Sequence, residues 1–141
     1  HVAWGELTQE RLSIDAIYST PNSPYDSADR FGASLAWAPA PLAQPSQAPT
    51  LAISAPRRAV GDASEAGEVT LWRDEGGRLR RVGRVVGQTQ RPGAQFGVSL
   101  EGGHFAGRST LLVGAPYANA GTQANAVEAG GVLLIDLEEQ P

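Results

Sequence analysis

The sequence lacks cysteine, methionine and lysine altogether across its 141 residues. Without cysteine, the fold cannot depend on disulfides, and no thiolate is present to bind a metal or to act as a nucleophile. No apolar run approaches the roughly 20 residues that a membrane-spanning helix needs, so we expect no membrane span. Because the chain does not begin with methionine, we expect His1 to be a processed or trimmed N-terminus.

The charge of the chain is weakly negative, at −4, and its 11 basic residues are all arginine. A nucleic-acid-binding protein needs a concentrated basic surface, so the sequence argues against nucleic acid as a partner. Four arginines cluster at Arg78, Arg80, Arg81 and Arg84. Their spacing favours the solvent-facing side of a β-strand over a phosphate-binding patch.

Apolar residues make up 41% of the chain, alongside 17 glycines and 10 prolines. This composition is typical of a folded, turn-rich domain, because disordered chains carry fewer aliphatic residues and more charge. The length fits one compact domain.

Three short segments occur twice, in the same order. The first copies are residues 30–35 (RFGASL), 51–56 (LAISAP) and 66–72 (AGEVTLW), and the second copies are 95–100 (QFGVSL), 111–116 (LLVGAP) and 129–135 (AGGVLLI). The copies are 65, 60 and 63 residues apart. A common period across three landmarks indicates a structural repeat.

Residues 51–55, 69–72, 111–113 and 132–137 are short aliphatic runs bounded by glycine, proline or polar residues, which predicts strands. Leu79, Val82 and Val85 are spaced three apart, but the nearby glycines and β-branched residues favour a strand with a bulge. Residues 39–49 are rich in alanine, proline and glutamine and predict a loop.

The N-terminal part of the chain continues the same pattern. Residues 2–4 and 11–17 resemble residues 69–72 and 78–85, so the chain opens in the middle of a repeat. Four short strands per period predict an all-β fold of β-propeller blades, about two four-stranded antiparallel blades whose boundaries are out of phase with the termini. We therefore expect a single propeller segment over residues 1–141: the end of one blade in 1–29, a full blade in 30–92, and most of a further blade in 93–141.

Two motif pairs carry a family resemblance. Residues 96–97 (FG) with 114–116 (GAP), and 31–32 (FG) with 54–56 (SAP), are similar to the FG-GAP repeat of the integrin α N-terminal β-propeller. The resemblance implies that each repeat forms a four-stranded blade and that Phe31 and Phe96 pack in the core. Serine replaces glycine at residue 54, so the first copy departs from the motif at one position.

The resemblance raises the question of calcium, which many members of the family bind between the two landmarks. Calcium needs several closely spaced oxygen ligands. Residues 101–109 offer one carboxylate, Glu101, and residues 36–50 offer none. We therefore predict a shortened turn at 101–109, with no calcium and no other cofactor.

Candidate catalytic groups are few. His104 lies near Glu101 in the sequence, but we interpret it as a surface-turn residue. Ser99 and Ser109 lack the Gly-x-Ser-x-Gly context of an activated nucleophile, and no phosphate-binding glycine-rich loop with lysine is present. We expect the chain not to be an enzyme.

Ligand binding is easier to assign, because propellers display variable loops at one face of a rigid framework. The resemblance to integrin-like propellers implies that this face comprises residues 19–29, 57–65, 88–94 and 117–128. The residues that we expect to contact a ligand are Tyr25, Arg57, Arg58, Tyr117, Asn119, Gln123 and Asn125. Trp4, Trp37 and Trp72 fall on predicted strands, so we expect them to pack in the core.

The resemblance, together with the missing initiator methionine, implies a binding or adhesion module outside the cytoplasm, periplasmic, secreted or at the cell surface, whose partner is a protein or a glycan. A second interpretation is a structural subunit or fragment that completes a propeller or larger complex with other chains, because repeat units need neighbours to bury their faces. A third is an accessory propeller part of a secreted enzyme.

Overall fold

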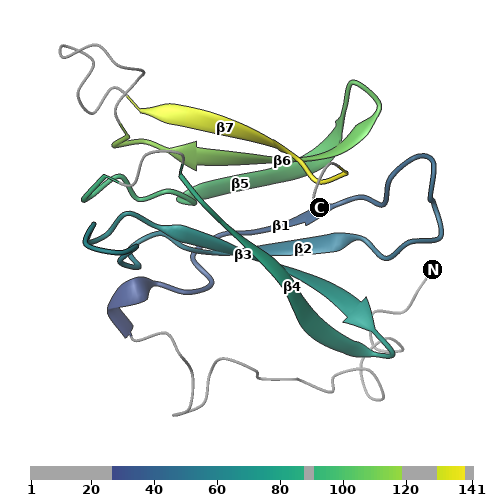
Figure 1. Cartoon of the computed structure of the whole chain (residues 1–141), viewed down its shortest axis with the longest axis horizontal. Helices are drawn as coiled ribbons and strands as arrows, with labels where there is room; N and C mark the ends of the chain where they lie inside the picture. The colour runs from purple at the N-terminus through teal and green to yellow at the C-terminus, as the bar shows by residue number, and fades with distance from the viewer. Residues whose placement is uncertain (1–26, 88–90, 119–129, 139–141) are drawn as a thin grey trace, which may run out of the picture.

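The computed structural model describes residues 27–87, 91–118 and 130–138 of the chain. These residues form an all-β fold of two antiparallel sheets, one of four strands and one of three, which lie one above the other (Figure 1). The strands predicted over residues 2–4 and 11–17 lie outside the described residues. Within the described part, no helix is long and apolar enough to cross a membrane.

The first sheet has the strand order β1-β2-β3-β4, so each strand pairs with the next along the chain. Its strands are β1 (Leu35–Ala38), β2 (Thr50–Ala55), β3 (Glu68–Glu75) and β4 (Arg78–Val86), preceded by a short 3₁₀ helix, η2 (Ser27–Asp29). The β3–β4 pairing shifts register between Leu71 and Trp72, which leaves Val82 as an extra residue on β4. The bulge predicted in this strand is therefore confirmed.

The second sheet repeats this arrangement with the order β5-β6-β7. Its strands are β5 (Ser99–Phe105), β6 (Arg108–Ala115) and β7 (Gly131–Asp136). The turn predicted over residues 101–109 is wrong in extent, because only Ala106 and Gly107 separate β5 from β6. Both have positive φ, 52° and 77°, as a two-residue type I′ hairpin requires. His104 therefore lies on a strand and not in a turn.

The two sheets share one backbone pattern at their first motif. The N–H of Gly32 donates to the carbonyl of Ser54 at 2.8 Å, and the N–H of Gly97 donates to the carbonyl of Gly114 at 2.9 Å. The two glycines have φ of 88° and 98°, a left-handed conformation that glycine adopts without steric cost. The Phe-Gly dipeptide of each sheet is thus tied by the same hydrogen bond to the residue that precedes Ala-Pro.

The serine that replaces glycine in the first sheet has its own hydrogen-bond partner. Ser54 is fully buried, and its Oγ accepts a hydrogen bond from the Ser34 N–H at 3.0 Å. In the second sheet the corresponding residue is Gly114, and the Ser99 Oγ occupies the space that a Cβ would fill there. A serine hydroxyl therefore fills the corresponding space in each sheet: Ser54 supplies it in the first sheet and Ser99 in the second.

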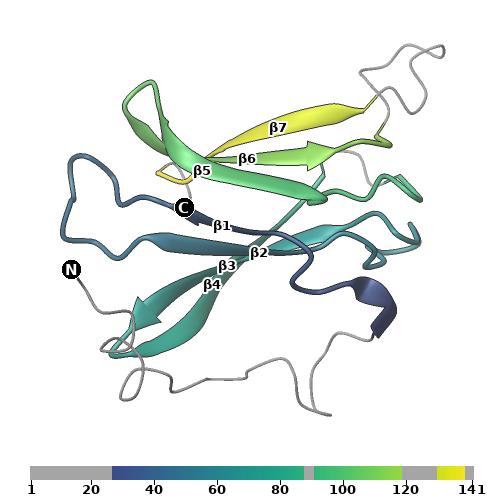
Figure 2. The ribbon, with the colours of Figure 1, turned by 180° about the vertical axis from the view of Figure 1, so that it is seen from behind.

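The hydrophobic core lies between the sheets. Its members include Val69 and Leu71 from β3, Leu111 and Val113 from β6, and Phe96 from the segment before β5. In Figures 1 and 2, β1 and β5 lie side by side at the inner edges of the two sheets. The backbone of β5 approaches β1 so closely that a Cβ on Gly102 would overlap the main chain of Trp37 and Ala38.

The predicted core residues divide into two groups. Phe96 and Trp72 are each only 3% exposed, as predicted. The Trp72 indole N–H donates to Thr70 Oγ1 at 2.8 Å, which satisfies its one polar atom. Phe31 is only half-buried, and Trp37 is 56% exposed, so the prediction of core packing is wrong for Trp37. Trp37 lies on the side of β1 that faces away from β5, and Trp4 lies outside the described residues.

Candidate functional site

The described parts of the loops assigned to ligand binding gather at one end of the two sheets, on the left in Figure 1. Three backbone hydrogen bonds join the loop after β2 to the segment before β5. The N–H groups of Gly93, Gln95 and Phe96 donate to the carbonyls of Ser64, Glu65 and Ala66 at 2.8, 3.0 and 2.8 Å. This set of segments, residues 56–67, 91–98 and 116–118, is called the loop end below. Main-chain bonds fix its shape, so its side chains are displayed on a rigid base.

Arg58, one of the predicted ligand contacts, is engaged within the molecule. Its Nη1 lies 2.8 Å from Asp29 Oδ2 and its Nε lies 3.6 Å from Glu68 Oε2. The Glu68 side chain is 5% exposed and also accepts from Arg84 Nε at 2.7 Å. A buried carboxylate needs such cationic partners, because desolvation of an unpaired charge is costly. The geometry therefore assigns Arg58 mainly to holding η2 and β3 together.

Arg57, by contrast, presents its side chain to solvent. Its Nε lies 3.2 Å from Glu65 Oε1, and the two side chains are 41% and 44% exposed. An ion pair this exposed contributes little stability, so both groups can exchange their mutual contact for one with a ligand. The Arg57 N–H donates to the carbonyl of Asp29 at 3.2 Å, which fixes the backbone beneath the side chain.

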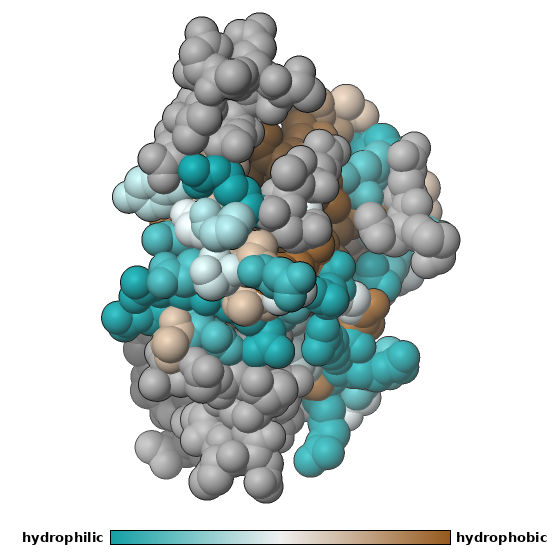
Figure 3. Space-filling view, turned by 60° about the vertical axis from the view of Figure 1, so that its left-hand side comes forward, coloured by the Kyte–Doolittle hydropathy of each residue, from teal (hydrophilic) through white to brown (hydrophobic). Residues whose placement is uncertain are grey.

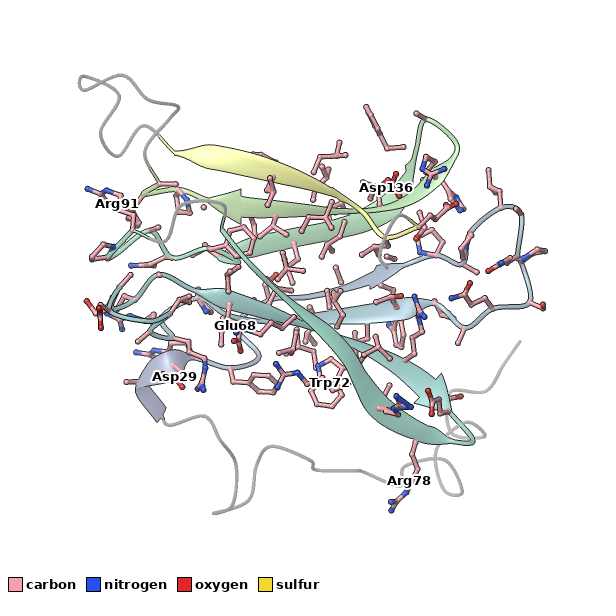
Figure 4. The ribbon with its side chains drawn as sticks, in the orientation of Figure 1. Asp29, Glu68, Trp72, Arg78, Arg91 and Asp136 are labelled. Carbon is pink, nitrogen blue, oxygen red and sulfur yellow. The ribbon has the colours of Figure 1, made fainter. Side chains whose placement is uncertain are left out.

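Tyr117 is the exposed aromatic residue at the loop end, at 47%. Its carbonyl accepts a hydrogen bond from Arg91 Nη1 at 2.9 Å, which ties the segment before β5 to the start of the loop after β6. Figure 4 places Arg91 at this end of the molecule. Arg91 falls in a loop that the sequence predicted for the ligand face, but nothing in its neighbours marks it as a connecting residue.

Four of the predicted contact residues, Tyr25, Asn119, Gln123 and Asn125, lie outside the described residues. Of the remaining three, the structure puts Arg57, Arg58 and Tyr117 at one end of the sheets, with Arg58 turned toward Asp29 and Glu68. The charged residues that connect the loops there, Asp29 and Arg91, had not been assigned a role from the sequence.

A groove of about 420 Å³ lies at the opposite end. It is bordered by the loop between β1 and β2, by β3 and β4, and by the turn after β7, and its polar lining includes Gln44, Gln47, Arg73 and Glu138. Arg73 Nε donates to Thr50 Oγ1 at 3.2 Å, and Glu138 Oε2 accepts from the Ser109 N–H. These polar groups thus serve within each sheet, Arg73 between β3 and β2 and Glu138 between the turn after β7 and β6.

The two side chains of the one acid–base pair suggested by the sequence lie on opposite faces of a strand. Glu101 and His104 are three residues apart on β5, and residues an odd number apart point to opposite faces of a strand. His104 Nε2 instead lies 2.9 Å from the carbonyl oxygen of Ala40. Among the described residues, no three His, Asp or Glu side chains gather in a way that would hold a metal ion.

Comparison with known proteins finds no matching family model and no matching curated protein.

Proposed function

We propose that the two sheets are successive blades of an FG-GAP-type propeller segment. Three observations support this. The sheets have the same strand order, the two Phe-Gly dipeptides make the same hydrogen bond, and the inner strands β1 and β5 lie side by side. Stacked antiparallel sheets related by a sequence repeat are the architecture of propeller blades.

The function that we propose is binding of a protein or glycan at the loop end, outside the cytoplasm and without catalysis. One observation carries this proposal: main-chain hydrogen bonds from 93–96 to 64–66 fix loops from both sheets on one surface. A ligand that binds a preordered surface loses less conformational entropy on binding, which raises affinity. Exposed arginine and tyrosine, here Arg57 and Tyr117, are enriched at protein interfaces.

Binding can be tested on the full chain with a glycan array and with immobilised extracellular-matrix proteins. We expect Arg57→Ala and Tyr117→Ala each to weaken capture by about tenfold, because interface arginines and tyrosines commonly contribute at least 1.4 kcal/mol. Both variants should melt at the wild-type temperature, since both side chains are exposed.

Two matched controls lie away from the loop end. Arg78, at the far end of β4 in Figure 4, is an exposed arginine, and Phe105 is an aromatic residue 60% exposed. Arg78→Ala and Phe105→Ala should leave capture unchanged. Equal losses in all four variants, or capture by none of the probes, would contradict the loop end as the binding surface.

A second candidate function, a structural subunit that assembles with other chains, is favoured by a separate observation. The sheet β5–β7 exposes Val132 at 74% and Leu134 at 45% on its outer side. Single exposed aliphatic residues are common, but adjacent ones on a sheet face are typical of interaction surfaces.

A further inference from the structure

The groove at the end opposite the loop end is built by a segment of the first sheet that has no counterpart in the second. Residues 39–49 connect β1 to β2, whereas Ala106 and Gly107 alone connect β5 to β6. Figure 1 shows the longer connection at the right, and the loop end comes forward in Figure 3. A loop added to one repeat creates a new surface without changing the core, and such insertions commonly carry binding residues.

Hydrogen bonds hold this connection against the second sheet. Ser109 Oγ donates to the carbonyl of Pro39 at 2.6 Å, and His104 Nε2 lies 2.9 Å from the carbonyl oxygen of Ala40. Within the connection, two main-chain hydrogen bonds of 3.0 and 2.9 Å close successive turns over residues 41–47. The wall of the groove is therefore ordered before any ligand binds, which lowers the entropy cost of binding.

Arg73 borders the groove from strand β3. It lies two residues after the core residue Leu71, so both side chains are on the face that looks toward the second sheet. Its Nε donates to Thr50 Oγ1 at 3.2 Å, which orients the planar guanidinium. Among the described residues, the two Nη groups of Arg73 have no hydrogen-bond partner, and neither is buried. Arg73 therefore keeps its outer donors for a ligand.

The positive charge of Arg73 is not compensated by a carboxylate in the part of the chain that the structure describes. The other two charged residues that border the groove each have a counter-ion. Arg84 Nε lies 2.7 Å from Glu68 Oε1, and Glu138 Oε1 lies 4.0 Å from Arg108 Nη1. The groove therefore favours an anion close to Arg73.

Uncharged polar groups border the groove as well. Gln44 and Gln47 belong to the connection, and neither side chain has a hydrogen-bond partner among the described residues. Each amide offers both donors and an acceptor, which matches hydroxyl groups that donate and accept. The apolar side chains of Val82 and Leu137 also line the groove, and such groups suit the C–H face of a sugar ring.

We propose that the groove binds a sugar that carries a carboxylate, namely a hexuronic acid. The two Nη groups of Arg73 donate parallel hydrogen bonds to the carboxylate, the bidentate geometry that a guanidinium and a carboxylate share. The amides of Gln44 and Gln47 bind the ring hydroxyls. One arginine balances the single charge of a carboxylate, whereas a phosphate group carries more than one. A volume of about 420 Å³ accommodates one sugar ring.

This site is separate from the loop end, because the residues that line the groove and those of the loop end do not overlap. The inference therefore does not depend on the function proposed above. Arg57→Ala and Tyr117→Ala should leave uronic acid binding unchanged. Absence of uronic acid binding contradicts this inference alone, and absence of capture by the loop end contradicts only the binding function proposed there.

Calorimetric titration of the full chain with methyl β-glucuronide, at fixed ionic strength, tests the proposal. We expect saturable binding that weakens by at least about tenfold in Arg73→Gln and Arg73→Lys, because charge-assisted bidentate hydrogen bonds are strong and lysine lacks the planar fork. Methyl β-glucoside lacks the carboxylate and acetate lacks the ring, so each should bind at least about tenfold more weakly than the glucuronide. Inorganic phosphate should also bind more weakly.

Arg81→Lys is the matched control. Arg81 is an exposed arginine that pairs with Trp72 and so lies on the opposite face of the sheet from Arg73. This variant should bind the glucuronide like the wild type. An equal loss in Arg81→Lys and Arg73→Lys would show that net charge alone attracts the ligand, which would overturn the proposal.

A double variant, Gln44→Ala with Gln47→Ala, keeps the test decisive if the Arg73 variants do not fold. It removes no hydrogen bond to a described residue, so it should melt like the wild type and bind the glucuronide at least about fivefold more weakly. Unchanged affinity in this variant overturns the proposal. So does a wild type that does not bind the glucuronide, or that binds the glucoside, acetate or phosphate equally well.

Discussion

At the scale of single residues, Gly67 is a position at which the two repeats approach each other closely through their main chains. It has a φ of 94°, and a Cβ there would overlap the carbonyl oxygen and nitrogen of Phe96. Only glycine allows the carbonyl of the preceding Ala66 to receive the Phe96 N–H at 2.8 Å. The loop end and the core therefore meet at a residue without a side chain.

Gly67→Ala should consequently lower the free energy of unfolding by considerably more than its left-handed backbone alone explains. Gly77→Ala is the matched control, because Gly77 has a φ of 86° but no atom within 4 Å of its Cβ position. We expect about 1–2 kcal/mol for the control, from backbone strain, and about 1–3 kcal/mol more for Gly67→Ala, from overpacking. Urea denaturation measures both, and equal losses would show that the close approach to Phe96 has no energetic effect.

Residue burial was predictable for some side chains and not for others. Phe96 and Trp72 lie in aliphatic surroundings and are buried as their sequence context indicates. Trp37 lies in an equally apolar strand but faces outward, because the close approach of β5 requires small side chains on the inner side of β1. That choice depends on Gly102, some 65 residues away, and no local pattern reports it.

At the scale of elements, two ion pairs join β3 to β4 in different surroundings. Arg84 Nε lies 2.7 Å from Glu68 Oε1, and the Glu68 side chain is 5% exposed. Arg80 Nη1 lies 3.2 Å from Glu75 Oε1, with both side chains more than half exposed. The same two strands thus hold a partly buried pair and a solvated pair, which allows a direct comparison.

Arg84→Met should lower the free energy of unfolding by about 1–3 kcal/mol, because it removes a hydrogen bond to a buried carboxylate. Arg58 still pairs with the Glu68 carboxylate in this variant, so the loss of stability stays below that expected for a wholly unpaired buried charge. Arg80→Met should change stability by less than about 0.5 kcal/mol, as expected for an exposed pair. Thermal and urea unfolding of the two variants provide the measurement. A loss at Arg80 as large as at Arg84 would mean that burial of Glu68 is irrelevant.

Strand positions followed from the sequence more reliably than strand lengths. The runs at 51–55 and 111–113 lie inside β2 and β6, and the bulge in β4 is present. The segment 101–109 was predicted to be a shortened turn because it stands where many members of the FG-GAP family carry a calcium loop and it offers only one carboxylate. Gly102 and Gly103 lie in strand β5 instead, where Gly102 permits contact with β1.

At the scale of the whole molecule, we expect stability to be independent of calcium. The segments between the Phe-Gly and Ala-Pro landmarks carry one carboxylate in one repeat and none in the other. The melting temperature in millimolar calcium should therefore equal the melting temperature measured with a chelator. Magnesium serves as the control cation. A calcium-specific rise would contradict this, because a cation that binds only the folded state must stabilise it.

The arrangement of the sheets was only partly accessible from the sequence. The period near 63 predicted two similar groups of strands, and the two sheets have the same strand order. The predicted positions of the loops pointed to the loop end. Arg58, however, was predicted to contact a ligand, whereas its side chain contacts Asp29 and Glu68. Asp29 and Glu68 lie 29 and 10 residues from Arg58 in the chain, and only the folded sheet brings the three side chains together.

The hydrogen bonds that join 64–66 to 93–96 run between main-chain atoms, so they do not depend on which side chains these segments carry. Evolution can therefore alter the chemistry displayed at this surface while its shape is inherited unchanged. Glu65 and Gln95 are exceptions, because their φ values of 51° and 55° favour glycine, asparagine or aspartate as replacements. Gly93, with a φ of 76°, and the buried Ala66, Ala94 and Phe96 are constrained as well. Sequence diversity among relatives should therefore concentrate at the exposed positions of these loops, and libraries randomised at those positions should keep their fold.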